Sequence, residues 1–164
     1  MKKFPKVYKE RLLVGRFEWC SLINLKIPAI KVKVDSGAKT SSLHAFDIQP
    51  YVKEGVAYVK FKVHPLQGNS TLAVKCRAKI IDTRTIMSSN GHAERRFVIM
   101  TKLQLGEQIW PIELTLSNRD PLRFRMLLGR EAMGNHTVIV PDKMLIQGHR
   151  TKDYLDDLYS SVKT

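Results

Sequence analysis

The sequence predicts an all-β domain whose strands are mainly antiparallel, arranged as a barrel or a sandwich. Two observations lead to this prediction: short segments alternate apolar and polar side chains, and turn signals separate these segments. No linker, internal repeat or low-complexity tract divides the 164 residues, a length sufficient for one core. We therefore expect a single domain over residues 1–164, with a basic extension at 1–10 and a helix at about 151–162.

Strands are expected wherever apolar residues recur with a period of two. Residues 30–34, 56–61 and 112–116 show this alternation, which is typical of strands with one buried face. The apolar runs "FVIM" at 97–100 and "TVIV" at 137–140 predict two further strands, buried on both faces.

Turn signals lie between the expected strands. They are Lys53-Glu54-Gly55, Gln67-Gly68-Asn69, Asn90-Gly91, Leu105-Gly106-Glu107 and Pro141-Asp142. Asn-Gly is a favoured two-residue hairpin turn because both residues tolerate positive φ. Residues 90 and 91 therefore predict the tip of a β-hairpin.

Two segments predict helices. Residues 130–133 form a short apolar-polar segment that ends at Gly134, a residue type common just after a helix. Residues 151–162 start at Thr151, a residue type that caps helices. One face of this second helix would carry Tyr154, Leu155, Leu158, Tyr159 and Val162.

The net charge of +13 and the pI near 9.9 favour an anionic partner, such as nucleic acid, a ribosome surface or an acidic peptide. The alternative is a solvated basic surface that only maintains solubility. Aromatic residues show no clear arrangement among the basic residues along the sequence, in contrast to what single-strand nucleic-acid binders use. Trp19 and Trp110 are expected to be core aromatics.

Cysteine content and hydropathy predict a cytoplasmic protein without a membrane segment. Cys20 and Cys76 form no Cys-x-x-Cys pair, and both are expected to be reduced, small core residues. The apolar runs are too short to cross a bilayer, and the N-terminus lacks the apolar region of a secretory signal.

Several catalytic motifs are missing from the sequence. It contains no phosphate-binding Gly-x-x-x-x-Gly-Lys, no Gly-x-Gly-x-x-Gly, no Gly-x-Ser-x-Gly and no His-Glu-x-x-His. A zinc site assembled in space from His44, His64 and Cys76 is an alternative that no ligand spacing supports. We therefore expect neither a metal nor another cofactor.

The segment "VKVDSGA" at residues 32–38 places an aspartate at the end of an expected strand. Aspartate is depleted in strands, so this position needs a reason. Asp35 is either a turn residue or a catalytic carboxylate. In an aspartic protease two carboxylates about 3 Å apart share one proton, so that one activates water and the other acts as an acid.

The segment "VDSGAKTSSLHA" resembles the Asp-Thr/Ser-Gly-Ala active-site loop of the retropepsin-like aspartic proteases. The later "MLLGR" resembles the apolar-apolar-Gly motif that precedes a short helix in these proteins, and "SSNGH" occupies the position of their flap hairpin. The resemblance implies a closed acid-protease barrel with a short helix after the Leu-Leu-Gly motif and a C-terminal helix. The longer separation from Asp35 to Leu128 than in viral retropepsins indicates extra strands at about residues 50–80.

The match is closer to a bacterial branch, the RimB-type family, which also bears the label "ATP-dependent zinc protease". It rests on "IPAIKVKVDSGAKTSSLHAFDI", "VHPLQ", "SSNGHAERRFVI", "WPIELTLSNRD" and "FRMLLGREAM", and it spans roughly residues 11–148. The sequence shows neither an ATP-binding loop nor a zinc motif, so only the retropepsin part of the description has support in the residues.

The resemblance implies catalytic roles for Asp35, Ser36 and Gly37. It implies substrate contacts for Ala38, Lys39, Thr40, Ser89, Asn90, Gly91, His92, Leu128, Gly129 and Arg130. Since the chain holds a single Asp-Ser-Gly, two copies would have to meet at Asp35 in a homodimer. The simpler alternatives are an ordinary hairpin tip at 90–91 and a plain strand-to-helix turn at Gly129.

Three functions follow as hypotheses. The first is a dimeric aspartic endopeptidase that acts on a peptide or protein. RimB-type proteins are similar to partners of a ribosomal-protein glutamate ligase, which suggests an acidic glutamylated tail as the substrate. The second is a non-hydrolytic adaptor of that ligase, and the third is a basic barrel that binds ribosomes or RNA.

Overall fold

The structure is a computed structural model that describes residues 10–88, 90–118 and 123–162. The first half of the chain forms β1 (Leu12–Val14), β2 (Phe17–Leu22), a 3-10 helix (Ile23–Leu25), β3 (Ile27–Val34), β4 (Ser42–His44), β5 (Phe46–Lys53), β6 (Val56–Val63) and β7 (Val74–Lys79). The second half forms β8 (Asp82–Met87), β9 (Ala93–Leu105), β10 (Gln108–Ser117), β11 (Met126–Leu128), α1 (Arg130–Met133), β12 (Thr137–Ile139) and α2 (Lys152–Ser160). The prediction of a mostly β fold is confirmed.

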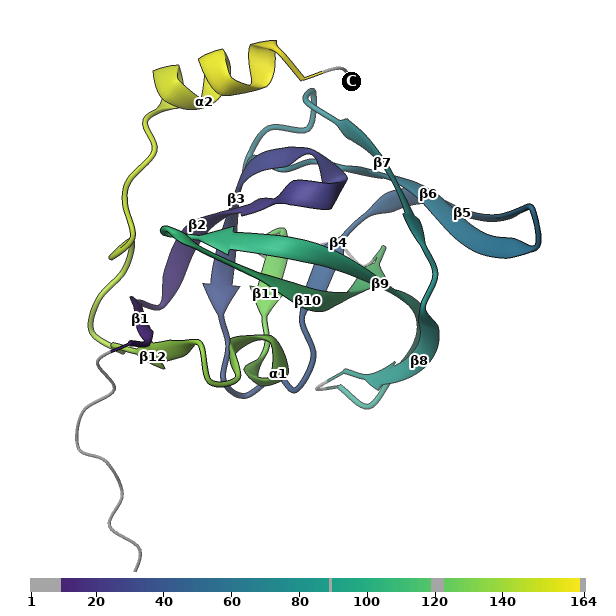
Figure 1. Ribbon diagram of the computed structural model, residues 1–164, viewed down its shortest axis with the longest axis horizontal. Coiled ribbons are helices and arrows are strands. Elements are labelled where there is room, and N and C mark those ends of the chain that lie inside the picture. The colour runs from purple at the N-terminus through teal and green to yellow at the C-terminus, as the bar shows by residue number, and fades with distance from the viewer. Residues whose placement is uncertain (1–9, 89, 119–122, 163–164) are drawn as a thin grey trace, which may run out of the picture.

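Six strands form a closed ring. Hydrogen bonds link them in the order β10, β4, β11, β3, β2 and β9, and β9 pairs again with β10 (Figure 1). β8 continues the sheet outside the ring by pairing with β9. Most pairs are antiparallel, as expected, but β11 runs parallel to β3, β4 runs parallel to β10, and β1 runs parallel to β12. Such parallel pairs require long connections, which alternation in the sequence does not reveal.

The ring encloses the hydrophobic core. β3 places Ile30 and Val32 inside at 0% exposure, while the alternate residues Lys31 and Lys33 lie on the other face. Trp110 is buried as expected, and its indole N–H donates to the Ala132 carbonyl of α1 at 2.8 Å. Cys20 and Cys76 are buried free thiols, which confirms that they are core residues.

A separate three-stranded sheet contains β5, β6 and β7. The β5–β6 hairpin projects from the ring on the right of Figure 1. These strands are the insertion expected at about residues 50–80. The inner face of the sheet packs Val59, Phe61 and Val63 against the core.

β8 and β9 form the predicted hairpin at Asn90-Gly91. Met87 pairs with Ala93, the Ser88 N–H donates to the His92 carbonyl at 2.8 Å, and Gly91 has a φ of 83°. Ser89 lies outside the described residues.

Both predicted helices are present. α1 has the expected bounds, and the Thr151 hydroxyl accepts from the Tyr154 N–H at the start of α2. Leu155 and Tyr159 are buried, but Tyr154 is 50% exposed, so its place on the apolar face was predicted wrongly. Its ring lies beneath the Arg150 guanidinium instead.

A buried carboxylate fastens the segment before α2 to the ring. Glu18 is 0% exposed and accepts from the backbone N–H groups of Gly15, Ile146 and Gln147 at 2.8–3.0 Å. Within the described part of the chain, no helix is long and apolar enough to cross a membrane.

Candidate active site

Asp35 lies directly after β3, at the mouth of the ring. Its N–H donates to the Leu128 carbonyl at 3.0 Å, which extends the β3–β11 pairing by one residue. Its carboxylate Oδ1 accepts from the Gly37 N–H at 3.0 Å, and its carbonyl accepts from the Ala38 N–H at 3.2 Å. The backbone therefore holds the carboxylate on a tight turn, in which Ser36 and Gly37 are exposed.

β11 lies between β3 and β4, so the loop that joins those two strands must cross the end of β11. This crossing brings Gly129 against the loop. A Cβ at Gly129 would lie 2.6 Å from the carbonyl carbon of Thr40, closer than real Cβ contacts allow. The Gly129 N–H donates to Ser41 Oγ at 2.9 Å. Glycine is therefore required here by the close approach of two backbones.

α1 supports the same loop from the other side. The Arg130 N–H donates to the Ala38 carbonyl at 2.8 Å, and the Glu131 N–H donates to the Lys39 carbonyl at 3.2 Å. The Arg130 guanidinium donates to the Ser36 carbonyl at 3.2 Å. Arg130 thus holds the Asp35 turn in place with both its backbone N–H and its side chain.

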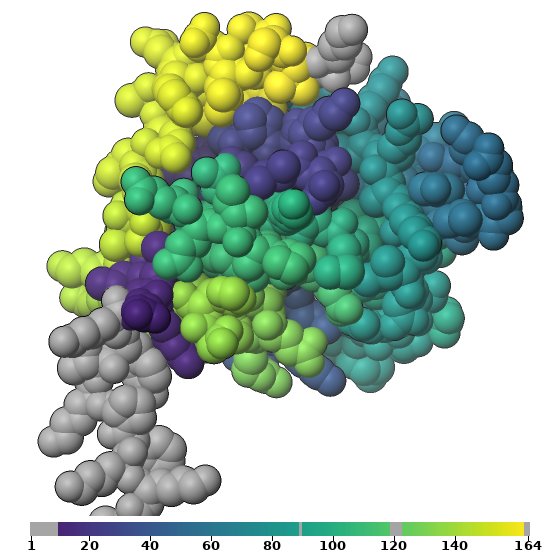
Figure 2. Space-filling model, in the orientation of Figure 1, coloured from purple at the N-terminus to yellow at the C-terminus, as the bar shows by residue number. Residues whose placement is uncertain are grey.

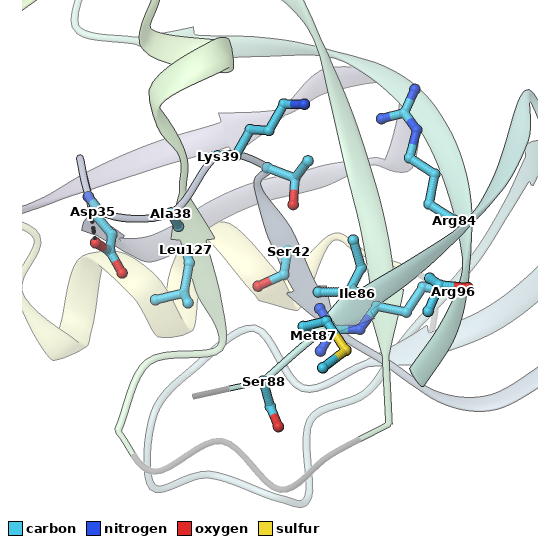
Figure 3. Close-up of a pocket in the computed structure, with 13 residues that line it drawn as sticks. Asp35, Ala38, Lys39, Ser42, Arg84, Ile86, Met87, Ser88, Arg96 and Leu127 are labelled. Atoms are coloured by element: carbon cyan, nitrogen blue, oxygen red, sulfur yellow. Dashed lines mark hydrogen bonds between the residues drawn. The ribbon is translucent and has the colours of Figure 1, made fainter. Parts of the chain in front are cut away.

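A cleft of about 790 Å³ opens beside Asp35. One wall is the segment from Asp35 to Ser42 together with Leu127. The other is Arg84 to Met87 of β8, the following Ser88, and Arg96 of β9. In Figure 3, Asp35 and Leu127 lie on one side of the cleft, and Arg84 and Arg96 lie on the other. The cleft is a groove between the Asp35 loop and the β8–β9 hairpin.

The charges that line the cleft are mostly positive. Asp35 is the only carboxylate among the described residues of the lining, against Lys39, Arg84 and Arg96. Arg84 donates to Asp82 at 2.9 Å and to Glu113 at 2.7 Å, and these hydrogen bonds raise the pKa of its guanidinium. Arg84 is therefore positively charged near neutral pH.

A backbone contact also fixes the acidic partner of Arg84. The Thr83 N–H donates to the Asp82 carboxylate at 2.8 Å, and this bond, followed by the Arg84 hydrogen bond, lowers the pKa of Asp82. In β9, the Arg96 guanidinium donates to the Glu94 carboxylate of the same strand at 3.0 Å. These ion pairs hold the two arginines in place along the β8–β9 wall.

The structure brings some of the expected site residues together and separates others. Asp35, Gly37, Ala38, Lys39 and Thr40 all line the cleft. The other described candidates lie outside its lining: Ser36 is on the outer side of the turn, Leu128, Gly129 and Arg130 support the loop from behind, and Asn90, Gly91 and His92 form the hairpin tip.

The sequence interpretation missed the part of the hairpin that faces Asp35. Arg84, Thr85, Ile86 and Met87 of β8 line the cleft, rather than the Asn-Gly tip. The β-branched residues of "TRTIM" could have marked this segment as a strand that leads into the hairpin, but only the folded structure shows that this strand lies across the cleft from Asp35.

Potential metal ligands do not cluster in the residues that the structure describes, where no group of three or more His, Cys, Asp or Glu side chains could hold an ion. His64 Nδ1 is within 2.9 Å of the Leu72 carbonyl, and its ring stacks on Phe46. Cys76 is buried, with Sγ 3.5 Å from the Leu25 carbonyl. His64 and Cys76, two of the three residues of the alternative zinc site, therefore have other partners in the fold.

Residues 13–150 match the profile of the RimB-like family, which is described as retropepsin-like aspartic endopeptidase RimB. Among proteins of known sequence, the chain is 46% identical over 154 residues to a probable alpha-L-glutamate ligase of Shewanella pealeana. It is 49% identical over 152 residues to a protein of the same name from Desulfotalea psychrophila. These alignments cover 94% and 93% of this chain but only 33% of each relative, so the chain spans about a third of the length of these relatives.

A solved structure has a related fold. Protein Lpg0085 of Legionella pneumophila, whose function is described as unknown, superimposes with a TM-score of 0.66 at 25% identity. The superposition covers 82% of this chain and 97% of the Legionella chain.

Proposed function

The chain belongs to the RimB-like family of retropepsin-like aspartic endopeptidases, and from this premise we propose that it hydrolyses peptide bonds with Asp35 as the catalytic carboxylate. The observation that supports the proposal best is the position of Asp35. Its carboxylate lies at a strand end, on a turn held by β11 and α1, and it lines a cleft large enough for a peptide segment.

In the proposed mechanism a second copy of the chain supplies the second carboxylate. Asp35 is the only carboxylate that lines the cleft among the described residues, and Ser36 and Gly37 are exposed beside it. Two copies related by a two-fold axis through this turn would bring both Asp35 side chains together. The pair would then share one proton, one carboxylate activating water and the other protonating the carbonyl oxygen or the leaving nitrogen.

The proposed substrate is an acidic peptide. Lys39, Arg84 and Arg96 line the cleft, but each already has an acidic partner in a salt bridge, so the attraction for a chain of glutamates comes mainly from the net charge of +13. The relatives support this choice, because a region similar to this chain forms a third of proteins named probable alpha-L-glutamate ligase. The physiological context that we propose is the processing of a glutamylated ribosomal-protein tail in the cytoplasm, alongside such a ligase.

The decisive experiment measures cleavage of a peptide library that includes glutamate-rich members, at several pH values between about 4 and 8, the range in which carboxyl dyads change protonation. The wild-type chain is compared with Asp35→Asn and with Asp142→Asn, an exposed acid outside the cleft. We expect wild type and Asp142→Asn to cut alike, and Asp35→Asn to lose activity by at least about a thousandfold, as for other essential catalytic groups. Equal cleavage by all three proteins would reject the proposal.

A second candidate is the non-hydrolytic adaptor of a glutamate ligase, which the names of the relatives favour. It predicts that no variant cuts any peptide, whereas a glutamate ligase changes its rate when the wild-type chain is added. Binding to the ligase that is insensitive to Asp35→Asn would support this adaptor function over the protease.

A further inference from the structure

The outer face of the β5–β6–β7 sheet collects cations from segments that are distant in sequence. Lys60 lies opposite Arg77, Lys62 lies opposite Lys75, and Tyr58 lies opposite Lys79 in the antiparallel register. Directly opposite residues of such a pair share one face of the sheet. With Lys53 of β5, the face carries six cations: Lys53, Lys60, Lys62, Lys75, Arg77 and Lys79. We call it the basic face.

The basic face lies away from the core. The alternate residues of the same strands, Val59, Phe61 and Cys76, point inward and are at most 6% exposed. Lys60, Lys75 and Arg77 are exposed. The β5–β6 hairpin protrudes from the body of the molecule, at the right of Figure 2, and so the face is reachable for a large ligand.

Few acids neutralise this face. Among the residues that the structure describes, Lys62 is the only one of the six in a salt bridge, with Asp47 at 3.2 Å. Glu54, at the β5–β6 turn, is the other acid nearby. Like charges directly opposite on neighbouring strands destabilise a sheet, and an anionic ligand would relieve that repulsion. Charge alone fits any polyanion.

Two tyrosines favour a nucleic acid over an acidic peptide. Tyr51 of β5 lies opposite Tyr58 of β6, and their rings stack with centroids 5.6 Å apart and an angle of 18°. Both tyrosines line a hollow of about 500 Å³ together with Lys53 and Arg77. Aromatic rings next to a basic groove are the arrangement with which proteins bind single-stranded nucleic acid, because bases stack on the rings and phosphates contact the cations.

We propose that the basic face binds single-stranded nucleic acid, with phosphates along the rows of Lys60, Lys62, Lys75 and Arg77 and a base against the Tyr51–Tyr58 pair. Alternate residues of a strand are about 6.6 Å apart, which suits successive phosphates of an extended strand. This site is separate from the Asp35 cleft, whose lining shares no residue with it. It would hold the enzyme on a nucleic-acid-containing assembly while the cleft acts on protein.

The test is the binding of fluorescein-labelled oligouridylate to the full chain, followed by anisotropy between about 50 and 200 mM salt, where counterion release makes phosphate contacts measurable. Lys60→Glu/Arg77→Glu is compared with Lys102→Glu/Lys152→Glu, which changes the net charge equally outside the face. We expect the first double variant to bind at least about tenfold more weakly and to lower the salt slope by about 1.4, at 0.7 per phosphate contact on a single strand. The control should stay within about threefold of wild type, since exposed charges far from the site are screened.

The stacking part is tested with Tyr51→Ala/Tyr58→Ala, which should weaken binding by roughly tenfold, whereas Tyr51→Phe/Tyr58→Phe should retain it. Equal losses of oligouridylate affinity in both charge-reversal variants would overturn the proposal, because they would mean that the net charge of the whole protein, and not the basic face, attracts the oligonucleotide. No loss on removing both rings, together with full displacement by oligoglutamate, would overturn it in favour of an acidic peptide. Cleavage of a peptide without acidic residues should be unchanged in all these variants, so this result is independent of the role of Asp35.

Discussion

At the scale of single residues, Gly37 and Gly129 constrain the Asp35 turn in different ways. A Cβ on Gly129 would meet the Thr40 backbone at 2.6 Å, whereas a Cβ on Gly37 would meet only the Asp35 carboxylate, at 3.2 Å. To make room for a Cβ on Gly129, the main chains at Gly129 and Thr40 would have to move apart, which would disturb β4 and β11. A Cβ on Gly37 would displace only the side chain of Asp35.

These contacts predict opposite outcomes for two alanine variants. Gly129→Ala should lower the free energy of unfolding by about 2 kcal/mol or more, because it overpacks two backbones. Gly37→Ala should change it by only about 0.5 kcal/mol, yet reduce peptide cleavage, because the Asp35 carboxylate must shift. Urea unfolding and peptidase assays of both variants check this, and a Gly37→Ala protein that is unstable but fully active per folded chain would contradict it.

The two buried cysteines should make the stability of the protein fall at alkaline pH. Burial raises the pKa of the Cys76 thiol from its ordinary value of 9.0 to about 12, and it raises the pKa of Cys20 as well. The unfolded chain therefore loses these protons first as the pH rises, and the stability that the neutral thiols contribute is complete below pH 9.0 and lost towards about pH 12.

We expect the free energy of unfolding to fall more steeply across this alkaline range in the wild type than in Cys20→Ala/Cys76→Ala. Burial of the phenol raises the pKa of Tyr159 too, so part of the decline should persist in the double variant. Denaturant titrations at several pH values measure both slopes. Identical slopes would show that the thiols do not titrate differently in the two states.

At the scale of elements, the side chain of Tyr159 links α2 to β3 by hydrogen bonds. The β2–β3 pairing shifts register between Cys20 and Leu22, which leaves Ala29 without an opposite residue in β2. Tyr159 supplies both bonds: its hydroxyl donates to the Ala29 carbonyl and accepts from the Ala29 N–H. The helix thus provides hydrogen-bond partners for the backbone of Ala29, where the sheet is irregular, and it also buries apolar surface.

Tyr159→Phe should therefore lower the free energy of unfolding by about 1–3 kcal/mol, the usual cost of leaving buried polar groups unpaired. Tyr154→Phe, on the exposed side of the same helix, should have no measurable effect. Thermal and urea unfolding of the two variants provide the comparison. Equal stability would mean that water replaces the tyrosine hydroxyl at Ala29.

At the scale of the whole molecule, the proposed activity depends on the concentration of the chain. If two copies supply one Asp35 each, the rate per chain should fall on dilution as the dimer dissociates. Added Asp35→Asn chains should lower the wild-type rate further, because mixed dimers contain one functional carboxylate. Sedimentation in parallel with the activity assay measures both effects, and a fully active monomer would contradict the dimeric mechanism.

Local patterns in the sequence predicted several elements of the fold. Alternation predicted β3, β6 and β10, the Asn-Gly pair predicted the β8–β9 turn, and Gly134 and Thr151 marked the helix boundaries. These features depend on neighbours in the chain, through side-chain period, turn geometry and capping. The Asp-Ser-Gly-Ala and Leu-Leu-Gly motifs likewise indicated the family that the comparisons confirm.

Only the tertiary structure decided which distant segments meet. The insertion of β11 between β3 and β4, the cleft wall formed by Arg84 and Met87, and the Tyr51–Tyr58 pair among the lysines all depend on strand register. Along the sequence the aromatics and cations showed no arrangement, because cross-strand neighbours are separated by the length of a hairpin. Register is set by the burial of whole sheet faces, and this property belongs to the packed molecule rather than to any single segment.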